Sequence, residues 1–269
     1  MSAPGRVSIV TGGATGIGLS VVEALISRGG QAVIAGPSDR ALDAAAERTG
    51  AATVVGDAGE QSVALAALNL ALDRWGRLDS VISCAGVPSF DNVHAASDEE
   101  WSRVLNANLR SAVTTVRTCL PALLDSRGTI VLVSSLAGVL AVPNAAPYIV
   151  SKHALIGLAR SLAGDFGPLG VRANVVCPGQ TRTGMLEEVM TDAAGHLGIT
   201  REEACRRAAA LTPRRLAATP EEIAEVILFL AGPASAAING AVIMADGGVS
   251  AVDLSMAGLR LFADEQASA

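Results

Sequence analysis

A glycine-rich turn between an apolar strand and an amphipathic helix is the feature that most limits how this chain can fold. Residues 7–10 form a short apolar β-type run, and the eight residues after it read TGGATGIG. Ile17, Val21 and Leu25 then recur at helical spacing, and the pattern ends at a pair of glycines, 29–30. Bare glycine backbone lets a pyrophosphate approach, and the amides at the start of the next helix bind its charge. In this setting the turn predicts a dinucleotide site, and the other interpretation is a tight turn without a ligand.

The alternation of β-type and helical segments continues along the whole chain. Nearly continuous apolar strands separated by helices indicate a parallel sheet that is covered on both faces. No linker rich in Pro, Gly or Ser divides the sequence, so we predict one doubly wound, Rossmann-like α/β domain over 1–269 with about seven strands. The predicted strands are 7–10, 31–35, 52–55, 80–83, 130–133, 172–176 and 241–244, and the predicted helices include 39–49, 61–75, 97–124, 148–166 and one that begins at a capping box, 219–222.

The charge balance and the cysteines exclude several classes of partner. The 269 residues are 50% hydrophobic and 17% charged, so a large core can be buried. A net charge of −6 leaves no basic surface for nucleic acid or an anionic membrane, and we expect small-molecule partners or further copies of the chain. The sequence lacks a signal-peptide pattern and a membrane-length apolar run, which favours a cytoplasmic protein. The four cysteines and three histidines have no metal-ligand spacing, so we expect reduced thiols and no metal site.

Tyr148 and Lys152 are the only tyrosine and the only lysine in the chain, which otherwise uses Arg, Phe and Trp. Four residues apart on a helix, both side chains lie on one face. A nearby ammonium favours phenolate and brings the pKa of a tyrosine toward the working range of an acid or base. Lysine is compact and can pass on a proton, which arginine does not do readily. The pair is therefore a candidate proton-transfer unit, and the structural alternative, a surface tyrosine packed over a lysine stem, carries equal weight.

Several small or polar residues directly follow the predicted strands. In a doubly wound sheet, ligands bind beyond the carboxyl ends of the strands. Asn108 lies instead inside the predicted helix 97–124, where an amide is a mediocre helix former, and both an exposed position and an inward, hydrogen-bonding position stay open. The residues that follow the strands are Asp57, Ala85, Gly86, Ser134, Ser135, Pro178 and Gly179.

Taken together, these motifs resemble the short-chain dehydrogenase/reductase family, and the resemblance covers residues 6–248. The turn TGGATGIG resembles the family's cofactor loop, and YIVSK (148–152) resembles its tyrosine–lysine signature. Asn174 and CPGQTRT (177–183) resemble the segment beside the nicotinamide, and ADGG (245–248) resembles the C-terminal signature. One departure is SCAG after the fourth strand, where the family usually has Asn-Asn-Ala-Gly; it removes two amides.

The resemblance implies an NAD(P)-dependent oxidoreductase that interconverts a secondary alcohol and a ketone by hydride transfer. It implies that Tyr148 exchanges a proton with the substrate oxygen and that Ser135 polarises that oxygen. It further implies that Lys152 lowers the pKa of the tyrosine and binds the nicotinamide ribose, and that Asn108 positions a water in the proton relay. Asp57 is expected to contact the adenine, and Thr183 to bind the carboxamide. The residues implied to contact the cofactor are Gly12, Thr15, Gly16, Ile17, Gly18, Gly36, Asp57, Ala85, Gly86, Tyr148, Lys152, Pro178, Gly179, Thr181 and Thr183.

The same resemblance divides the domain into a dinucleotide-binding half (6–90), a catalytic half (91–180), a substrate lid (183–215) and a C-terminal extension (249–269). The apolar residues of the lid are as consistent with core packing as with substrate contact. We expect a homo-oligomer, specifically a tetramer, because family members associate in this way and the stretch 249–262 is apolar.

Two other functions stay open. One is a 3-oxoacyl-thioester reductase acting on a carrier protein or CoA. Docking an acidic carrier calls for basic residues, and a negatively charged chain with one lysine offers no obvious patch, although clustered arginines could supply one. The other is a non-catalytic dinucleotide-binding regulatory protein; the presence of all four expected catalytic side chains argues against it.

The end of the second predicted strand bears on the choice of dinucleotide. An Asp or Glu there usually holds the ribose hydroxyls of NAD, whereas a 2′-phosphate needs Arg or Lys. Gly36 occupies this position, and Thr15 and Pro37 are neutral where phosphate-binding family members often carry a cation. Arg40 could reach back, but Asp39 beside it repels a phosphate, and the two residues can equally begin the next helix. The sequence therefore favours NAD over NADP.

Overall fold

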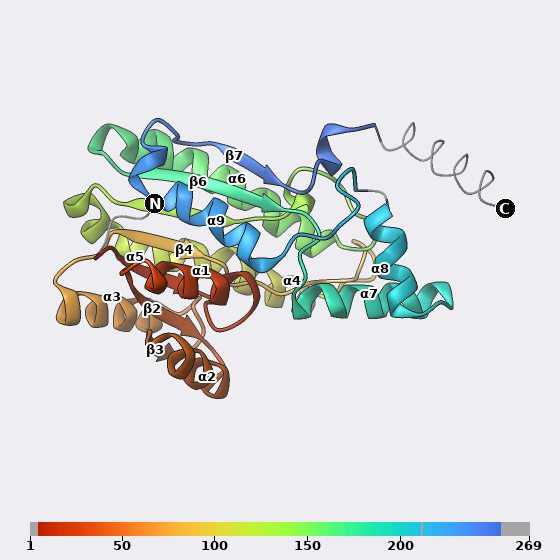
Figure 1. Ribbon diagram of the computed structural model, residues 1–269, viewed down its shortest axis with the longest axis horizontal. Helices are drawn as coiled ribbons and strands as arrows, with labels where there is room; N and C mark the ends of the chain where they lie inside the picture. Colours follow the sequence, from red (N-terminus) through yellow and green to blue (C-terminus); the bar gives the residue numbers. More distant parts are fainter. Residues whose placement is uncertain (1–4, 211, 254–269) are drawn as a thin grey trace.

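A seven-stranded sheet forms the centre of the computed structural model, which describes residues 5–210 and 212–253 (Figure 1). All neighbouring strands run parallel, in the order β3-β2-β1-β4-β5-β6-β7. The chain crosses from β3 over to β4, so β1 lies between β2 and β4 at the point where the strand order reverses, and ligands bind there in doubly wound folds. The strands are β1 (Val7–Thr11), β2 (Gln31–Gly36), β3 (Ala52–Val55), β4 (Ser80–Ser83), β5 (Thr129–Val133), β6 (Arg172–Pro178) and β7 (Val242–Ala245).

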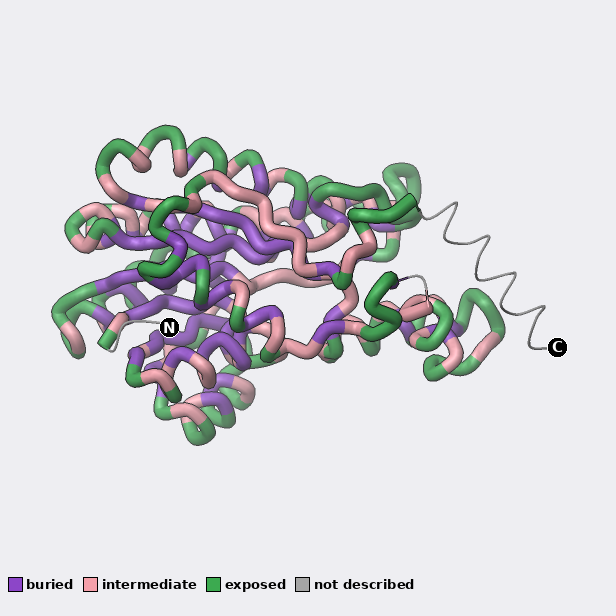
Figure 2. The backbone as a smooth tube through the Cα atoms, turned by 45° about the horizontal axis from the view of Figure 1, so that its top comes forward, coloured by how far each residue is buried: buried purple, intermediate pink, exposed green. Residues whose placement is uncertain are grey.

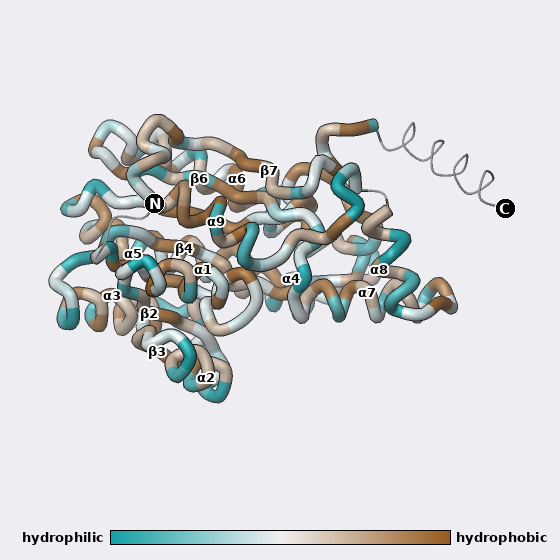
Figure 3. The backbone as a smooth tube through the Cα atoms, viewed as in Figure 1, coloured by the Kyte–Doolittle hydropathy of each residue, from teal (hydrophilic) through white to brown (hydrophobic). Residues whose placement is uncertain are grey.

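Helices cover both faces of this sheet. Ile9 packs in a core layer with α3, α5 and α6, whereas its neighbour Val10 packs in the opposite layer with α1, α2 and α9, because successive strand residues point to opposite faces. Figure 2 shows the strands buried inside more exposed helices, and Figure 3 shows hydrophobic residues along β6 and α9. The helices are α1 (Gly16–Ser27), α2 (Asp39–Thr49), α3 (Gln61–Trp75), α4 (Asp98–Leu105), α5 (Ser111–Ser126), α6 (Ala146–Phe166), α7 (Gly184–Leu197), α8 (Arg201–Ala210) and α9 (Pro220–Ala231).

The predicted alternation and the single doubly wound domain are confirmed. The strand bounds agree with the predicted ones to within two residues, and the helices 39–49 and 61–75 agree at both ends. Helix α6 begins at Ala146, earlier than predicted, because Pro147 fits the first turn of a helix, where its missing N–H is not needed. The capping box before α9 is complete: Thr219 Oγ1 accepts from the Glu222 amide, and the Glu222 carboxylate accepts from the Thr219 amide.

The predicted continuous helix 97–124 is wrong in its middle. A π-helical turn at Asn106–Arg110 separates α4 from α5, and the Ser111 amide donates to the Asn106 carbonyl five residues back. Such turns are rare and often occur at functional sites. Asn108 lies inside this turn, faces inward and has an exposed fraction of 0%.

Helices α7 and α8 stand beyond the carboxyl ends of the strands (Figure 1). They pack on each other through a small core of their own, which contains Met190, Ala194 and Ala204. Of the C-terminal extension 249–269, the part from 254 onward lies outside the described residues. No helix within 5–210 or 212–253 combines the length and the hydropathy needed to cross a membrane.

Candidate active site

The glycine-rich turn after β1 forms a cradle of bare backbone. A Cβ on Gly12 would lie 2.8 Å from the Cα of Ala85, and a Cβ on Gly18 would collide with the Gly12 carbonyl oxygen. Gly16 has a φ of +52°, in the left-handed region that favours glycine. Thr15 precedes α1 without capping it through its side chain, so the first amides of α1 keep their capacity to bind an anion. The turn therefore fits the pyrophosphate of a dinucleotide.

The segment after β6 closes the other side of this cradle. Thr183 caps α7 with its hydroxyl, and a Cβ on Gly16 would lie 3.2 Å from the Thr183 Cγ2. Thr181 is buried and donates its hydroxyl to the Gly179 carbonyl at 3.1 Å. Gly179 in turn packs on the C-terminal signature, because a Cβ there would lie 2.7 Å from the Cα of Asp246. Two segments far apart in the sequence thus face the glycine-rich turn.

The carboxyl ends of β2 and β3 carry the residues expected near the adenosine, Gly36 and Asp57. A Cβ on Gly36 would have no neighbour closer than the Leu42 Cδ2, at 4.0 Å, so bare backbone is not required at this position. Asp57 follows β3, is exposed, and accepts a hydrogen bond from the Gly59 amide at 2.8 Å. Arg40 is exposed in the first turn of α2, whose cap is Ser38.

Tyr148 and Lys152 lie on one face of α6, as their spacing predicted. The Lys152 Nζ is 5.7 Å from the centre of the tyrosine ring and donates to the Val133 carbonyl, at the end of β5, at 3.0 Å. Only 4% of Lys152 is exposed, whereas Tyr148 is half-buried. A lysine enclosed to this extent is not a solvated surface residue, so the interpretation as a surface pair is wrong.

Burial dominates the protonation of both groups. It lowers the pKa of Lys152 to about 8 and raises the pKa of Tyr148, and a hydrogen bond with the Ser135 side chain only partly offsets the second effect. The thiols near the ammonium are Cys84, after β4, and Cys177, on β6. Cys84 is half-buried, yet enclosure of its thiol raises the pKa to about 12, so this neighbour is neutral. The pKa of Tyr148 is thus raised although a lysine lies nearby, because the phenol loses its water.

The side chain of Asn108 joins three elements. Its Oδ1 accepts from the Val87 amide at 2.7 Å, and its Nδ2 donates to the Val87 carbonyl at 3.1 Å and to the Ser151 hydroxyl at 2.9 Å. A Cβ on Gly86 would lie 3.1 Å from the Asn108 Oδ1 and 3.3 Å from the Lys152 Nζ, so the amide and the ammonium flank the same glycine. Of the two positions left open for Asn108, the inward one is confirmed. Asn108 donates both of its amide hydrogens to protein groups. A water could therefore bind this side chain only by donating to its Oδ1.

Two adjacent serines connect β5 to α6. Ser135 lies beside Tyr148, and its Oγ accepts from the Ala137 amide at 3.1 Å. Ser134 is buried and donates to the Lys152 carbonyl at 2.8 Å. Gly138 allows this contact, because a Cβ there would collide with the Ser134 Oγ. One serine therefore faces the tyrosine and the other holds the turn of α6 that carries the lysine.

Asn174 does not belong to the site, contrary to the expectation from the resemblance. It is buried within β6, its Nδ2 donates to the Ile238 carbonyl at 2.9 Å, and its Oδ1 accepts from the Ala241 amide at 3.0 Å. Because it lies four residues before the end of the strand, it braces the connection to β7 instead of reaching the ligand edge. Ser151 was not identified from the sequence as a residue of the site. Its signal was a serine, a poor helix former, inside a helix and between the tyrosine and the lysine.

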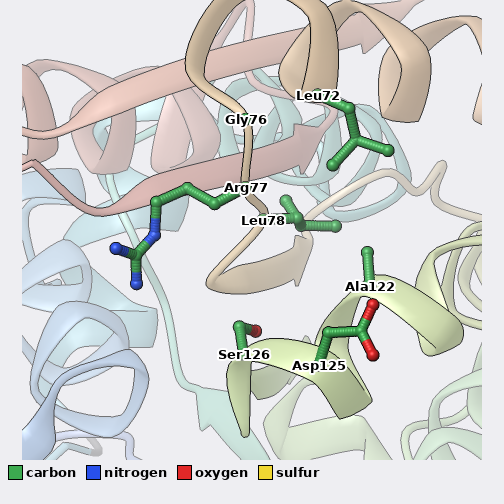
Figure 4. Close-up of a pocket in the computed structure, with 7 residues that line it drawn as sticks. All are labelled: Leu72, Gly76, Arg77, Leu78, Ala122, Asp125 and Ser126. Atoms are coloured by element: carbon green, nitrogen blue, oxygen red, sulfur yellow. The ribbon is translucent and has the colours of Figure 1, made fainter.

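Two surface hollows lie outside this cluster, and the second is lined in part by Gly138. The first, of about 270 Å³, lies near the amino end of β4, at the end of the strands opposite to the site. Figure 4 shows residues that line it, among them Leu78 and Asp125. The second, of about 430 Å³, lies along the outer face of α6 near His153 and Arg160. Within the described part of the chain, no three His, Cys, Asp or Glu side chains come close enough together to hold a metal ion.

Comparison with known proteins gives consistent matches along the chain. A family model described as enoyl-(acyl carrier protein) reductase matches residues 12–250. Protein MoaE of Klebsiella aerogenes is 39% identical over 251 residues, which cover 93% of this chain and 97% of that protein. The 2-(S)-hydroxypropyl-CoM dehydrogenase 3 of Xanthobacter autotrophicus is 32% identical over 256 residues, covering 92% and 97%. A variant of actinorhodin polyketide ketoreductase, solved with NADPH, matches with a TM-score of 0.88 at 27% identity, covering 94% of this chain and 100% of that one.

The family model spans the glycine-rich turn from Gly12 onward, the tyrosine–lysine helix and the strands β2 to β7. The fold, the order of the motifs and the identity of the relatives agree. The chain belongs to the short-chain dehydrogenase/reductase family and is an NAD(P)-dependent oxidoreductase that acts on CH–OH groups, interconverting secondary alcohols and ketones.

Proposed function

We propose that Tyr148 is the acid and base of this reaction, assisted by Ser135, Lys152 and Asn108. The observation that carries the proposal is the convergence of these four side chains from three separate parts of the chain. Ser135 hydrogen bonds to Tyr148, Lys152 lies 5.7 Å from its ring, and Asn108 flanks the same glycine as the lysine. A convergence of this kind supports proton transfer at the phenol oxygen.

A bound nicotinamide supplies or accepts the hydride at its C4 atom. In the reducing direction, Tyr148 gives its proton to the carbonyl oxygen while the carbonyl carbon gains the hydride, so the C–O π bond breaks and C–H and O–H bonds form. Ser135 donates a hydrogen bond to the same oxygen, and the Lys152 ammonium stabilises the phenolate that remains. In the oxidising direction each transfer runs backwards, and Tyr148 accepts the hydroxyl proton.

The protonation of the free protein suits the reducing step. A raised tyrosine pKa keeps the proton on Tyr148 until the substrate oxygen takes it. In the oxidising direction the phenolate needs more positive charge nearby than Lys152 provides, and an oxidised nicotinamide, which carries a positive charge, adds it.

The cofactor fits the groups that face it. Gly12, Gly16 and Gly18 with the start of α1 would hold the pyrophosphate, and Thr183 would lie at the nicotinamide end together with Thr181 and the turn at Pro178–Gly179. Ile17, Thr15, Ala85 and Gly86 would line the path between the two ends, and Asp57 and Gly36 would lie at the adenosine end.

We favour NAD over NADP as the preferred cofactor. Gly36 provides neither the acid that holds ribose hydroxyls nor a cation for a 2′-phosphate. The phosphate of NADP would lose water on binding without a cation to replace it, and this cost disfavours NADP. The ratio of kcat/KM for the two cofactors on one substrate tests this, and a tenfold preference for NADP, about 1.4 kcal/mol, would contradict it and point to Arg40 as the phosphate ligand.

Gly36→Asp should raise the NAD preference at least about tenfold, because a carboxylate accepts both ribose hydroxyls and repels a 2′-phosphate. A Cβ on Gly36 meets no atom closer than 4.0 Å, so the first carbon of the new side chain fits without strain. Gly36→Ala, which adds a Cβ at the same position without a carboxylate, is the matched control. An unchanged ratio in Gly36→Asp would show that the ribose binds elsewhere.

The loops after β4 and β5, which we assign to the substrate side of the site, carry several exposed apolar side chains, which supports a substrate with an uncharged, apolar part. The loops after β4 and β5 are joined by a hydrogen bond from Asn92 Nδ2 to Asn144 Oδ1 at 3.4 Å and by another from the Ala146 amide to the Asp91 carbonyl at 2.9 Å. We assign 183–215, with α7 and α8, as the lid over these loops. The exposed apolar side chains on the two loops are Phe90, Val93, Val139, Leu140 and Val142.

A 3-oxoacyl-thioester reductase is the second candidate, and the lid bears on it. Arg201, Arg206 and Arg207 lie on α8, where an acidic carrier would need free positive charge. Each of them pairs with a glutamate of the lid, two of them with Glu203. This pairing disfavours a carrier protein and leaves a small thioester or a simple ketone.

A panel of apolar ketones, secondary alcohols and 3-oxoacyl-CoA, followed by nicotinamide absorbance with Tyr148→Phe as the blank, decides between these candidates. Turnover of the simple compounds supports the proposal, and turnover of the thioester alone supports the second candidate. A complete lack of turnover would contradict both candidates.

We further propose a cytoplasmic homotetramer. Strand β7 is half-buried along its length and, within the described residues, pairs with β6 only, so its outer edge is open to another chain. The apolar stretch 249–262 adds to this, although it is described only to residue 253. Four free thiols agree with a reducing compartment.

A further inference from the structure

We propose that Ser151 is a positioning residue that holds Asn108, and through it the proton relay, in place beside Tyr148 and Lys152. This inference rests on the proposed function of those three residues. Ser151 lies between the tyrosine and the lysine on α6, and its exposed fraction is 0%, so its hydroxyl is satisfied by protein groups alone.

The hydroxyl of Ser151 is used in both directions. It donates to the Tyr148 carbonyl at 2.7 Å, which is a common bond for a serine within a helix. It also accepts from the Asn108 Nδ2 at 2.9 Å, and this second bond joins residues 43 positions apart, on α6 and in the π-helical turn. Because the hydroxyl hydrogen points at the Tyr148 carbonyl, the lone pairs point away from it, which fixes the direction from which Asn108 can donate.

The amide of Asn108 has one arrangement that satisfies it. Val87 binds the Asn108 Oδ1 through its N–H and the Nδ2 through its carbonyl, so a flipped amide would set donor against donor and acceptor against acceptor. Ser151 takes the remaining amide hydrogen. Without that hydroxyl, a buried N–H would lose its partner, and the amide would gain by rotating away from Val87 and Gly86.

Rotation of this amide matters because of what lies next to it. The Asn108 Oδ1 and the Lys152 Nζ approach Gly86 from two sides, within 3.3 Å of the position that its Cβ would occupy. A shifted amide therefore changes the space and the acceptors beside the ammonium. Misplacement of such groups by about 1 Å can cost up to a hundredfold in rate without any loss of chemical groups.

A serine with a merely structural role provides the matched control. Ser111 is also buried, with 1% exposed, and donates to the Ala107 carbonyl at 2.6 Å in the same π-to-α junction. Its hydroxyl has no hydrogen bond to the side chain of Asn108. Ser111→Ala should lower the Tm about as much as Ser151→Ala and leave kcat within about twofold of the wild type.

The test is a double-mutant cycle on the full-length enzyme, with kcat, KM for the cofactor and Tm measured for the wild type, Ser151→Ala, Asn108→Ala and the double variant. We expect Ser151→Ala to lower kcat about tenfold while KM for the cofactor stays within about twofold. In the Asn108→Ala background, the same change should alter kcat by less than about twofold, because the group that Ser151 positions is gone. Ser151→Cys keeps the volume but weakens the acceptor, so its kcat should resemble that of Ser151→Ala.

Three results would overturn the inference: an unchanged kcat in Ser151→Ala, a full kcat in Ser151→Cys, or a further tenfold loss when Ser151→Ala is added to Asn108→Ala. Coupling between the two substitutions in Tm but not in kcat would show that Ser151 only stabilises the fold, and this result would also overturn the inference. A wild type that turns over no alcohol or ketone would instead refute the proposed function, and the catalytic role of Ser151 with it. An active wild type without coupling refutes this inference alone.

Discussion

At the scale of single residues, the proposed chemistry depends on one phenol oxygen. Tyr148→Phe removes that oxygen and keeps the ring against which the Lys152 ammonium packs. We expect kcat to fall below about one hundredth of the wild-type value, the low end of what positioned acid–base catalysis supplies, while the Kd of the cofactor changes by less than about twofold. Single-turnover kinetics and a cofactor titration measure the two quantities. If Tyr148→Phe keeps more than about one hundredth of the wild-type kcat, a group other than Tyr148 transfers the proton.

The buried charge of Lys152 predicts a pH dependence of stability. The folded pKa is about 8 and the ordinary value is 10.5, so between these pH values the unfolded chain carries a proton that the folded chain lacks. The free energy of unfolding should therefore rise with pH through this window, by on the order of 3 kcal/mol at most. Below pH 8 the folded protein carries the full penalty of burying the Lys152 charge.

Lys152→Met isolates this effect, because it fills the same space without a charge. Denaturant unfolding of the cofactor-free proteins at pH 7 and pH 10 should show Lys152→Met more stable at pH 7, with a smaller advantage at pH 10. Burial of Cys84 and Cys119 raises their pKa values to about 12, which lowers the stability of the protein at high pH. Because this effect is present in the wild type and in Lys152→Met, it largely cancels in the difference between their free energies of unfolding. A difference that does not change with pH would mean that the ammonium is solvated.

At the scale of elements, the close contact between the β1 turn and α1 leaves no room for a side chain. Gly18→Ala would place a methyl group against the Gly12 carbonyl and 3.0 Å from the Gly13 Cα, so the turn must open. We expect the Kd of the cofactor to rise at least about tenfold and the Tm to fall. Calorimetric titration and thermal unfolding measure both.

Gly164→Ala is the control for this change. Gly164 lies in α6, has no heavy atom within 4 Å of its Cβ position and has an ordinary helical φ. Alanine should therefore stabilise the helix by about 0.5–1 kcal/mol and leave cofactor affinity unchanged. Equal effects of the two substitutions would show that the glycine cradle does not need bare backbone.

At the scale of the whole molecule, the open edge of β7 predicts self-association. Light scattering at micromolar concentration should give a mass near four times the 27.1 kDa of one chain. Two charged residues placed on the exposed side of β7 should lower that mass, because charges on an edge strand oppose strand pairing. A mass of one chain for the wild type would refute the proposed tetramer.

Much of this protein follows from its sequence alone. The βα alternation, the number of strands and the helix ends depend on contacts between residues two to four positions apart, which a pattern of apolar and polar residues reports directly. The glycine-rich turn between β1 and α1 and the placement of Tyr148 and Lys152 on one face of α6 are local in the same sense, and the structure has both.

Only the tertiary structure decided the rest, because it depends on contacts between residues far apart in the chain. The π-helical turn interrupts a segment whose local pattern is that of one helix, and the inward position of Asn108 is set by Val87 and Ser151. The lowered pKa of Lys152 comes from the loss of water around it, which no spacing of residues reports. The contact of Thr183 with Gly16 likewise exists only because the sheet brings the ends of β1 and β6 to the same edge.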